Sequence, residues 1–287
     1  MTTQEKNMKE HLQNKSHGSF QKKTKMCHCN KHGDYEVQEI NLPFGIGEFV
    51  QACPECRKER EQEEKRIQES HRQEGINNRL AISGIPKRYL DSTLANYKAN
   101  NQGQKYALRV ANSFLNELKT GSDSSLILYG LPGTGKTHLG CALAKEFLIN
   151  SEGRLPKIKY ASAYRATAEI KSCFSRDSQK TEWDVIREYQ NYDLVILDEV
   201  GIQFDSNAEK MIFFQIINGR YEDMKPTILI SNLTKSELIE FIGDRCFDRL
   251  SGGGGAVIPF GWDSYRQEKK ETKQCEKKGQ LRVVSGE

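Results

Sequence analysis

The sequence predicts an α/β fold with a mostly parallel sheet between layers of helices, and two observations lead to this prediction. Short apolar runs at 125–129, 158–160, 194–197, 227–231 and 256–259 alternate with stretches of helical apolar spacing. This alternation is typical of βαβ units. The run at 194–197 is apolar without interruption, as expected for a strand that is buried on both faces of a sheet.

Helices are expected over 106–118 and 136–148, on either side of the strand at 125–129. The 287-residue chain divides by composition into a polar tail at 1–25, a small module at 26–80, the α/β body at 82–266 and a charged tail at 267–287. We expect the first tail to be disordered and the last to be flexible. A charged helix is expected over 57–79, either as a solvated connector or as an arm that contacts a partner.

Composition argues against several classes of protein. No stretch is apolar for the ~18 residues of a membrane span, and the N-terminus lacks the apolar core of a signal peptide. We therefore expect a cytoplasmic protein that does not bind membranes, whose 8 cysteines are reduced or metal-bound. The net charge of +4 is compatible with nucleic-acid binding without demonstrating it.

A glycine-rich segment at 130–137 is the strongest functional signal. It reads GLPGTGKT, between a predicted strand and a predicted helix, and matches the GxxxxGK[ST] phosphate loop. Glycines let successive N–H groups face one anion, and the helix that follows adds its positive end. The expected nucleotide-binding residues are Gly130, Pro132, Gly133, Thr134, Gly135, Lys136, Thr137 and His138.

Two acidic residues follow the uninterrupted apolar strand. Asp198 and Glu199 would reach the carboxyl edge of the sheet, where ligands bind in open α/β folds. Asp198 and Thr137 would hold Mg²⁺, and Glu199 would polarise the water that attacks the γ-phosphate. Asn232, after the strand at 227–231, would orient water or sense the γ-phosphate; turn formation is the alternative role. The acidic pair favours an ATPase over a kinase.

Arg245 and Arg249 are four residues apart and would share one face of a short helix. Either could act as an arginine finger in the site of a neighbouring subunit. Surface ion pairs with Asp244 or Asp248 are the alternative. Arg220 is a weaker candidate of the same kind.

Cysteine and histidine residues cluster near the N-terminus. Cys29 and His32 form a CxxH pair, and Cys53 and Cys56 form a CxxC pair. Two close pairs of S and N ligands suit a structural, tetrahedral Zn²⁺ site. Cys27 is a rival first ligand and His28 a lesser one, and independent reduced thiols are the alternative.

Several segments together resemble the DnaC/IstB-like branch of AAA+ ATPases, and most closely the DnaC-type replicative helicase loaders. These segments are GIPKRYLDSTLANY (84–97), LILYGLPGTGKTHLGCALA (126–144), YDLVILDEVGIQ (192–203), PTILISNL (226–233), GDRCFDRL (243–250) and PFGWDSYR (259–266). The zinc knuckle resembles that of phage- or prophage-borne variants.

The resemblance implies an ATP-regulated protein that binds the replicative helicase hexamer through its N-terminal part and helps to place it on single-stranded DNA, with possible self-association. By position, Lys136 and Thr137 match Walker A, Asp198 and Glu199 match Walker B, Asn232 matches sensor 1, and Arg245 and Arg249 match the finger region. Candidate DNA contacts are Lys157, Lys159, Arg165 and Lys171, with Tyr160 and Tyr164 as stacking surfaces.

Three alternative functions remain open. An IstB-like helper of transposition would prefer duplex DNA. A zinc-stabilised adaptor would have a vestigial ATP site, against which the complete Walker residues argue. A small-molecule kinase would need a second substrate pocket, for which no motif is visible.

Overall fold

A computed structural model describes residues 23–39, 52–175, 178–201 and 207–265 of the chain. The tail at 267–287 and most of the tail at 1–25 lie outside these residues. The chain divides into two compact units, Met1–Arg72 and Gln73–Glu287. Within the described part of the chain, no helix has both the length and the apolar character needed to cross a membrane.

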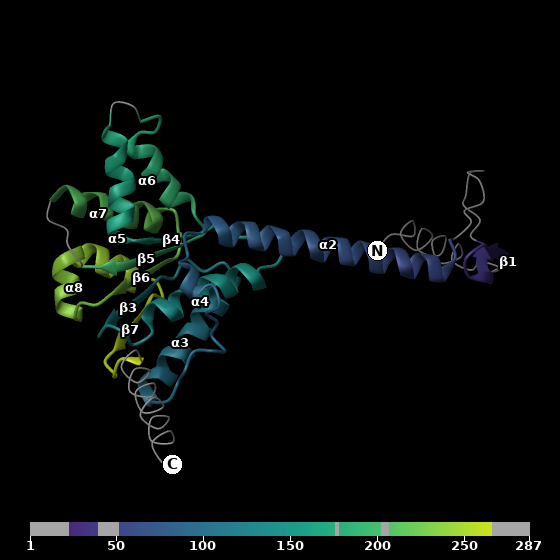
Figure 1. The fold of residues 1–287 in the computed structure, drawn as a ribbon, viewed down its shortest axis with the longest axis horizontal. Helices are drawn as coiled ribbons and strands as arrows, with labels where there is room; N and C mark the ends of the chain where they lie inside the picture. Colours follow the sequence, from purple (N-terminus) through teal and green to yellow (C-terminus); the bar gives the residue numbers. More distant parts are fainter. Residues whose placement is uncertain (1–22, 40–51, 176–177, 202–206, 266–287) are drawn as a thin grey trace, which may run out of the picture. The chain divides into compact units, whose positions relative to one another are not determined.

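The second unit contains a five-stranded parallel sheet, which confirms the predicted fold class (Figure 1). Its strands are β3 (Leu126–Gly130), β4 (Ile158–Ser162), β5 (Leu194–Val200), β6 (Thr227–Ser231) and β7 (Ala256–Phe260). They lie side by side in the order β4-β5-β6-β3-β7. All five begin within one residue of the apolar runs that predicted them, because each run is buried in the sheet.

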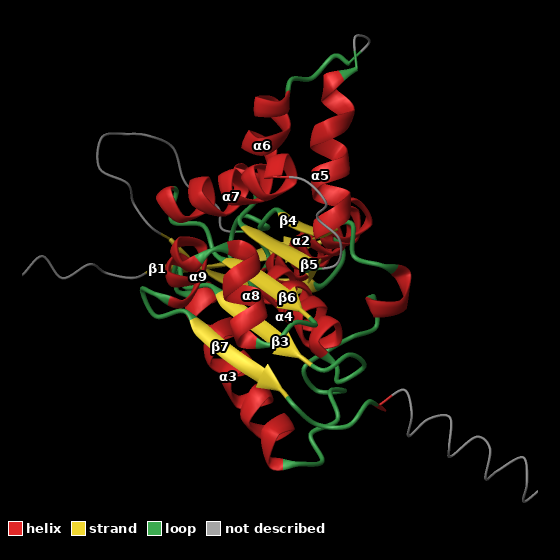
Figure 2. Ribbon diagram, turned by 90° about the vertical axis from the view of Figure 1, so that its left-hand side faces the viewer, coloured by secondary structure: helices red, strands yellow, loops and turns green. Residues whose placement is uncertain are grey.

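Helices cover both faces of this sheet (Figure 2). One apolar cluster joins α3 (Gln102–Lys119) and α4 (Lys136–Asn150) to alternate strand residues such as Leu126 and Leu128. The other joins residues such as Ile127 to helices on the opposite face: α5 (Ala163–Lys171), α6 (Glu182–Asn191), α7 (Asn207–Glu222), α8 (Lys235–Ile242) and α9 (Asp244–Ser251). Burial on both sides explains why the strands are continuously apolar.

The first unit contains a two-stranded antiparallel sheet that was not predicted. It is formed by β1 (Lys23–Cys29) and β2 (Gly33–Glu39). Residues 23–25 therefore belong to a strand, which corrects their assignment to the disordered tail: their backbone pairs with β2 from Lys23↔Glu39 onwards.

The charged helix is longer than predicted. Helix α2 spans Pro54–Ile82, so its last turns are counted with the second unit. It ends before Gly84, whose φ of +80° favours glycine. A short 3-10 helix, η1 (Lys87–Tyr89), follows; a second, η2 (Ser172–Phe174), extends α5.

Candidate nucleotide site and cysteine cluster

The phosphate loop connects β3 to α4, as predicted. Three of its glycines have positive φ, and a Cβ atom at each would meet a neighbour. At Gly130 it would lie 2.5 Å from the Phe260 carbonyl oxygen, and at Gly133 it would lie 2.0 Å from the Ser264 Oγ atom. These contacts are a second reason for glycine at these positions, in addition to phosphate binding.

Lys136 and Thr137 occupy the first turn of α4, where free N–H groups and the positive end of the helix favour phosphate. Lys136 is 4% exposed, and its Nζ atom donates hydrogen bonds of 2.7 Å to the carbonyls of Gly130 and Leu131. The ammonium group is thus held inside the loop that would surround the phosphates.

Asp198 faces this helix from the end of β5. It is 3% exposed, and its Oδ2 atom accepts a hydrogen bond of 2.8 Å from the Thr137 hydroxyl. Its Oδ1 atom accepts a hydrogen bond of 2.7 Å from the backbone N–H of Glu199. A buried carboxylate beside a hydroxyl is a donor set that suits Mg²⁺, so the residues present fit this ion.

Glu199 is exposed and has a φ of +57°, in the left-handed region that residues other than glycine rarely adopt. Such a conformation costs about 1–3 kcal/mol and persists where the surroundings impose it, often at functional sites. Here it coincides with a register shift between β5 and β6. The Glu199 side chain thereby lines the nucleotide cavity although the preceding strand residues are buried.

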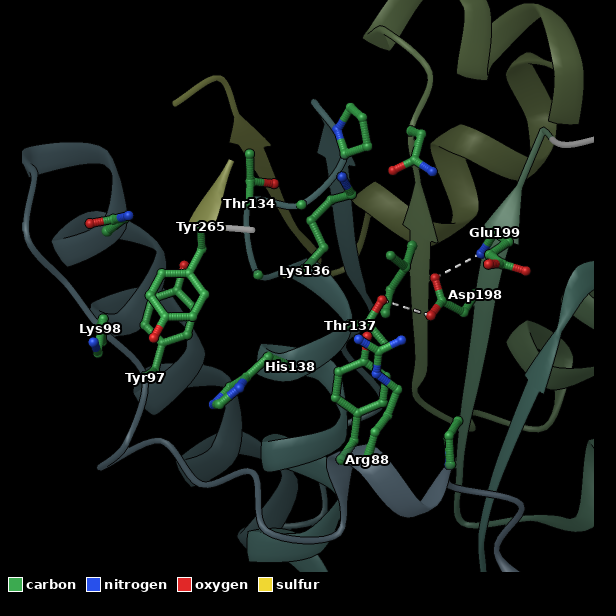
Figure 3. A pocket seen from close by; sticks show the side chains of 18 of the residues that line it. Arg88, Tyr97, Lys98, Thr134, Lys136, Thr137, His138, Asp198, Glu199 and Tyr265 are labelled. Carbon is green, nitrogen blue, oxygen red and sulfur yellow. Dashed lines mark hydrogen bonds between the residues drawn. The ribbon is translucent and has the colours of Figure 1, made fainter. Parts of the chain in front are cut away.

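These residues surround a cavity of about 670 Å³ at the carboxyl edge of the sheet (Figure 3). Of the predicted residues, those that line it are Pro132, Gly133, Thr134, Gly135, Lys136, Thr137, His138, Asp198, Glu199 and Asn232. Gly130 lies behind the loop, against β7.

His138 is placed at the side of this cavity. Its Nε2 atom lies 3.3 Å from the Thr93 carbonyl oxygen and its Nδ1 atom 3.5 Å from the Ser92 hydroxyl. Burial lowers the pKa of His138, so the ring is neutral at neutral pH. Its contacts hold the segment before α3 against α4.

Sequence reasoning did not assign a further set of residues to the cavity, from this segment and from other parts of the sheet and its helices. The additional lining residues are Pro86, Arg88, Tyr89, Asn96, Tyr97, Lys98, Gln104, Tyr160, Ile230 and Tyr265. Figure 3 shows Tyr97, Lys98 and Tyr265 on one side of the cavity, and Asp198 and Glu199 on the other. Most of the additional residues lie in the segments 84–97, 226–233 and 259–266, whose match to the family pattern was the one available signal because these residues form no chemical motif. Lys98, Gln104 and Tyr160 lie outside those segments.

Tyr97 has a hydroxyl that is buried and finds no hydrogen-bond partner among the described residues. Burial raises its pKa, so it remains a neutral group that could donate to a ligand. On the same side, Lys98 lies over the ring of Tyr265, 5.0 Å from its centroid. Aromatic and amide groups on this side suit the base of a nucleotide.

The segment after β7 lies directly on the phosphate loop. The indole N–H of Trp262 donates a hydrogen bond of 3.0 Å to the Thr134 carbonyl, and the N–H of Tyr265 donates one of 3.1 Å to the Gly133 carbonyl. The backbone carbonyls of the loop are therefore held by a side chain and a backbone N–H from a distant part of the sequence.

The candidate finger arginines lie away from this cavity. Arg245 and Arg249 are on α9, as predicted, and neither lines the cavity of its own chain. Arg245 is exposed, whereas Arg249 is half-buried, lies over the rings of Phe214 and Tyr221, and donates to the Asn218 side chain.

The suggestion that Arg220 could be a finger is wrong. Its side chain is fully buried, and its guanidinium donates to the carbonyls of Tyr189, Tyr192 and Pro226 and to the Thr227 hydroxyl. Burial lowers the pKa of Arg220 to about 9. A side chain with these partners cannot reach a neighbouring subunit.

In the first unit, Cys29, His32, Cys53 and Cys56 come together with their ligand atoms within 4.8 Å of one another. Cys29 and His32 lie at the turn between β1 and β2, while Cys53 precedes α2 and Cys56 is in its first turn. The His32 Nδ1 atom lies 3.3 Å from the Cys56 sulfur and 3.7 Å from the Cys53 sulfur. Three sulfurs and one nitrogen fit a closed zinc site.

The rival ligands are outside this cluster. Cys27 pairs with Tyr35 in the hairpin, and the His28 Nδ1 atom lies 2.5 Å from the Asp34 carboxylate. The structure therefore favours Cys29 as the first ligand. Backbone N–H groups of Lys31 and His32 lower the pKa of the Cys29 thiol to about 6, which favours the thiolate that a metal binds.

The candidate DNA contacts do not form one group. Tyr160 is not a surface platform, because it lines the nucleotide cavity and its hydroxyl donates to Asp198. Lys159 pairs with Glu169 and lies over the Tyr189 ring. The remaining candidates, Lys157, Tyr164, Arg165 and Lys171, are exposed. Tyr164 has 66% of its surface accessible.

A parallel sheet with a phosphate loop, a following Asp-Glu pair and the strand order β4-β5-β6-β3-β7 defines a P-loop ATPase of the AAA+ class. Residues 63–273 match the model of the IstB-like ATP binding proteins, and the chain belongs to this family.

Relatives of known name include the replicative helicase loader DnaC of Escherichia coli K12, which is 34% identical over 184 residues (64% of this chain and 73% of that protein). DnaC of Buchnera aphidicola subsp. Schizaphis graminum is 32% identical over 188 residues (66% of this chain and 74% of that protein). The crystal structure of a DnaC helicase loader superposes with a TM-score of 0.54 at 21% identity, over 61% of this chain and 99% of that one, and so shows a shared fold.

Proposed function

We propose that this chain is a DnaC-type loader that binds a replicative helicase hexamer and uses ATP to help place it on single-stranded DNA. The observation that carries the proposal is that the family match over 63–273 contains every residue that lines the nucleotide cavity. The named relatives in this family are helicase loaders.

The positions of the side chains support ATP hydrolysis as part of this proposal. The Lys136 ammonium would move from the loop carbonyls to the β- and γ-phosphates, and Thr137 and Asp198 would hold Mg²⁺. Bound Mg²⁺ would neutralise the charge that develops on these phosphates. Glu199 would orient and deprotonate the attacking water, and Asn232 would hold that water or the γ-phosphate.

An arginine from a second copy would complete the site. Arg245 is the better candidate because it is exposed on α9, whereas Arg249 is engaged with Asn218 and two aromatic rings of its own chain. This assignment implies that self-association on the helicase or on DNA accompanies hydrolysis.

The N-terminal module at 26–80 would bind the helicase, and Zn²⁺ would stabilise it. The cysteine cluster supports this part of the proposal, since among the described side chains Val37 and Cys53 are the buried apolar ones before α2. A segment with so little apolar burial depends on a metal for its fold. The ATPase domain at 82–266 would contact single-stranded DNA through the exposed basic residues of α5 and its surroundings, with Tyr164 as a stacking surface.

Two variants test the proposal in a helicase-loading assay with a single-stranded DNA substrate and the replicative helicase of the same host. Glu199→Gln is expected to bind ATP and the helicase but to hydrolyse ATP about 10²–10⁴-fold more slowly. Lys136→Ala is expected to lose ATP binding while it retains its zinc. Loading at the wild-type level by both variants would refute an ATP-driven mechanism.

The DNA preference of the wild type tests the alternative. Hydrolysis stimulated by single-stranded DNA in the presence of the helicase supports a loader. Preference for duplex DNA, with no helicase bound, would instead support an IstB-like helper of transposition. Hydrolysis that is lost in Glu199→Gln would exclude an adaptor with a vestigial site.

A further inference from the structure

Tyr160 connects the Walker B aspartate to the chain segment that follows α2. It lies on β4, and its hydroxyl donates a hydrogen bond of 2.8 Å to the Asp198 Oδ2 atom. Its backbone N–H donates a hydrogen bond of 2.7 Å to the carbonyl of Ser83, the residue after α2. The nucleotide chemistry described above does not use this side chain.

Asp198 needs such a partner because the last torsion of an aspartate is soft and roughly two-fold. Its Oδ1 atom is held by the neighbouring N–H of Glu199. Its Oδ2 atom accepts from Thr137 and from Tyr160. Thr137 belongs to the helix that would bind the phosphates, whereas Tyr160 belongs to the sheet, so Tyr160 is the side chain that holds Oδ2 independently of the nucleotide.

The backbone of Tyr160 is fixed on both sides. β4 is the edge strand of the sheet, and Tyr160 pairs with Ile196 of β5 on its inner side. On its outer side the Ser83–Gly84 junction covers the strand, and a Cβ atom at Gly84 would lie 2.5 Å from the Tyr160 carbonyl oxygen. A ring on a backbone held in this way can aim its hydroxyl precisely.

We propose that Tyr160 is a positioning residue that orients Asp198 for the magnesium–nucleotide complex and ties this orientation to the junction after α2. The inference rests on the proposed function, because it requires Asp198 to serve Mg²⁺. Tyr160 does not touch the reacting atoms; it acts through the carboxylate.

The test is Tyr160→Phe, which removes one oxygen and keeps the ring. Binding of a fluorescent ATP analogue is titrated with Mg²⁺ and, separately, in excess EDTA. We expect the Mg²⁺ concentration for half-maximal binding to rise about tenfold, equivalent to about 1.4 kcal/mol, and the affinity in EDTA to fall by a much smaller factor. A merely structural role would lower both affinities together.

Tyr189→Phe is the matched control. Tyr189 is 1% exposed, its hydroxyl donates a hydrogen bond of 2.7 Å to Glu169, and it does not line the nucleotide cavity. Its Mg²⁺ requirement should equal that of the wild type. An unchanged Mg²⁺ requirement in Tyr160→Phe, or an equal shift in both variants, would overturn this inference and leave the proposed function standing. Wild-type nucleotide binding that ignores Mg²⁺ would overturn the proposed function as well.

Discussion

Replacing Arg220 with alanine should destabilise the ATPase unit without directly altering a catalytic group. The substitution leaves the carbonyls of Tyr189, Tyr192 and Pro226 and the Thr227 hydroxyl without the donors that now lie 2.6–2.9 Å away. A buried polar group without a partner costs about 1–3 kcal/mol. The summed cost of these unpaired groups is partly offset, because water enters the space and a desolvated charge is removed. We therefore expect a loss of about 3–5 kcal/mol in the free energy of unfolding.

Urea denaturation followed by tryptophan fluorescence measures this loss. Both tryptophans of the chain, Trp183 and Trp262, lie in the second unit, so the signal reports that unit alone. The midpoint should fall while the slope with urea stays constant. The free energy of unfolding of Arg220→Lys should lie between those of the wild type and Arg220→Ala, because an ammonium has three donors and lacks the planar fork of arginine.

Arg245→Ala is the control, because this exposed arginine should change the free energy of unfolding by less than about 0.5 kcal/mol. Because Arg245 is the proposed arginine finger, Arg245→Ala should nevertheless lose ATP hydrolysis. The reasoning would be refuted if Arg220→Ala kept wild-type stability and lost hydrolysis, since that result would make Arg220 the finger after all.

Two further predictions concern the metal and the phosphate loop. The purified protein should contain one zinc ion per chain by elemental analysis. Cys29→Ser should lower the zinc content and Cys27→Ser should not. Equal loss of zinc in both variants would contradict the assigned cluster. Gly133→Ala should weaken ATP binding at least tenfold, because its Cβ atom would meet a side chain at 2.0 Å and its φ is +77°. Gly121→Ala has a φ of +84° but open space around the new atom, so it should cost only about 1–2 kcal/mol of stability and leave ATP binding unchanged.

The parts of the fold that sequence predicted are those whose signal is local. The strand at 194–197 is apolar because helices cover both faces of the sheet, and the loop at 130–137 has a fixed order of residues because one short segment surrounds the phosphates. The hairpin of β1 and β2 gave a weaker signal. Polar and apolar residues alternate over 34–38 in β2, where Tyr35 and Val37 are the apolar members, but not along β1. Val37 is the hairpin's one buried apolar residue among those whose burial is described.

The site was predicted where its residues form a short motif or directly follow a predicted strand. Arg220 resembles any basic residue near the end of a helix in the sequence, and only the tertiary structure shows that five acceptors surround it. Tyr97 and Tyr265 are far apart in the sequence, and both line the cavity. Such long-range placement leaves no periodicity or spacing from which it could be predicted.

The segment between α2 and α3 connects the nucleotide site to the end of α2. Lys145 of α4 donates to the carbonyls of Leu90 and Ser92, and Glu146 accepts from the N–H of Leu94. The same segment carries cavity residues such as Tyr97, and it begins where the Ser83 carbonyl meets the Tyr160 backbone.

If a helicase bound to the N-terminal module shifts this segment, it must change the affinity for nucleotide. By linkage, nucleotide must then change the affinity for the helicase by the same factor. Measuring both affinities in the wild type and in Tyr160→Phe would show whether the coupling passes through Asp198, because a coupling that does so should shrink when the Tyr160 hydroxyl is removed.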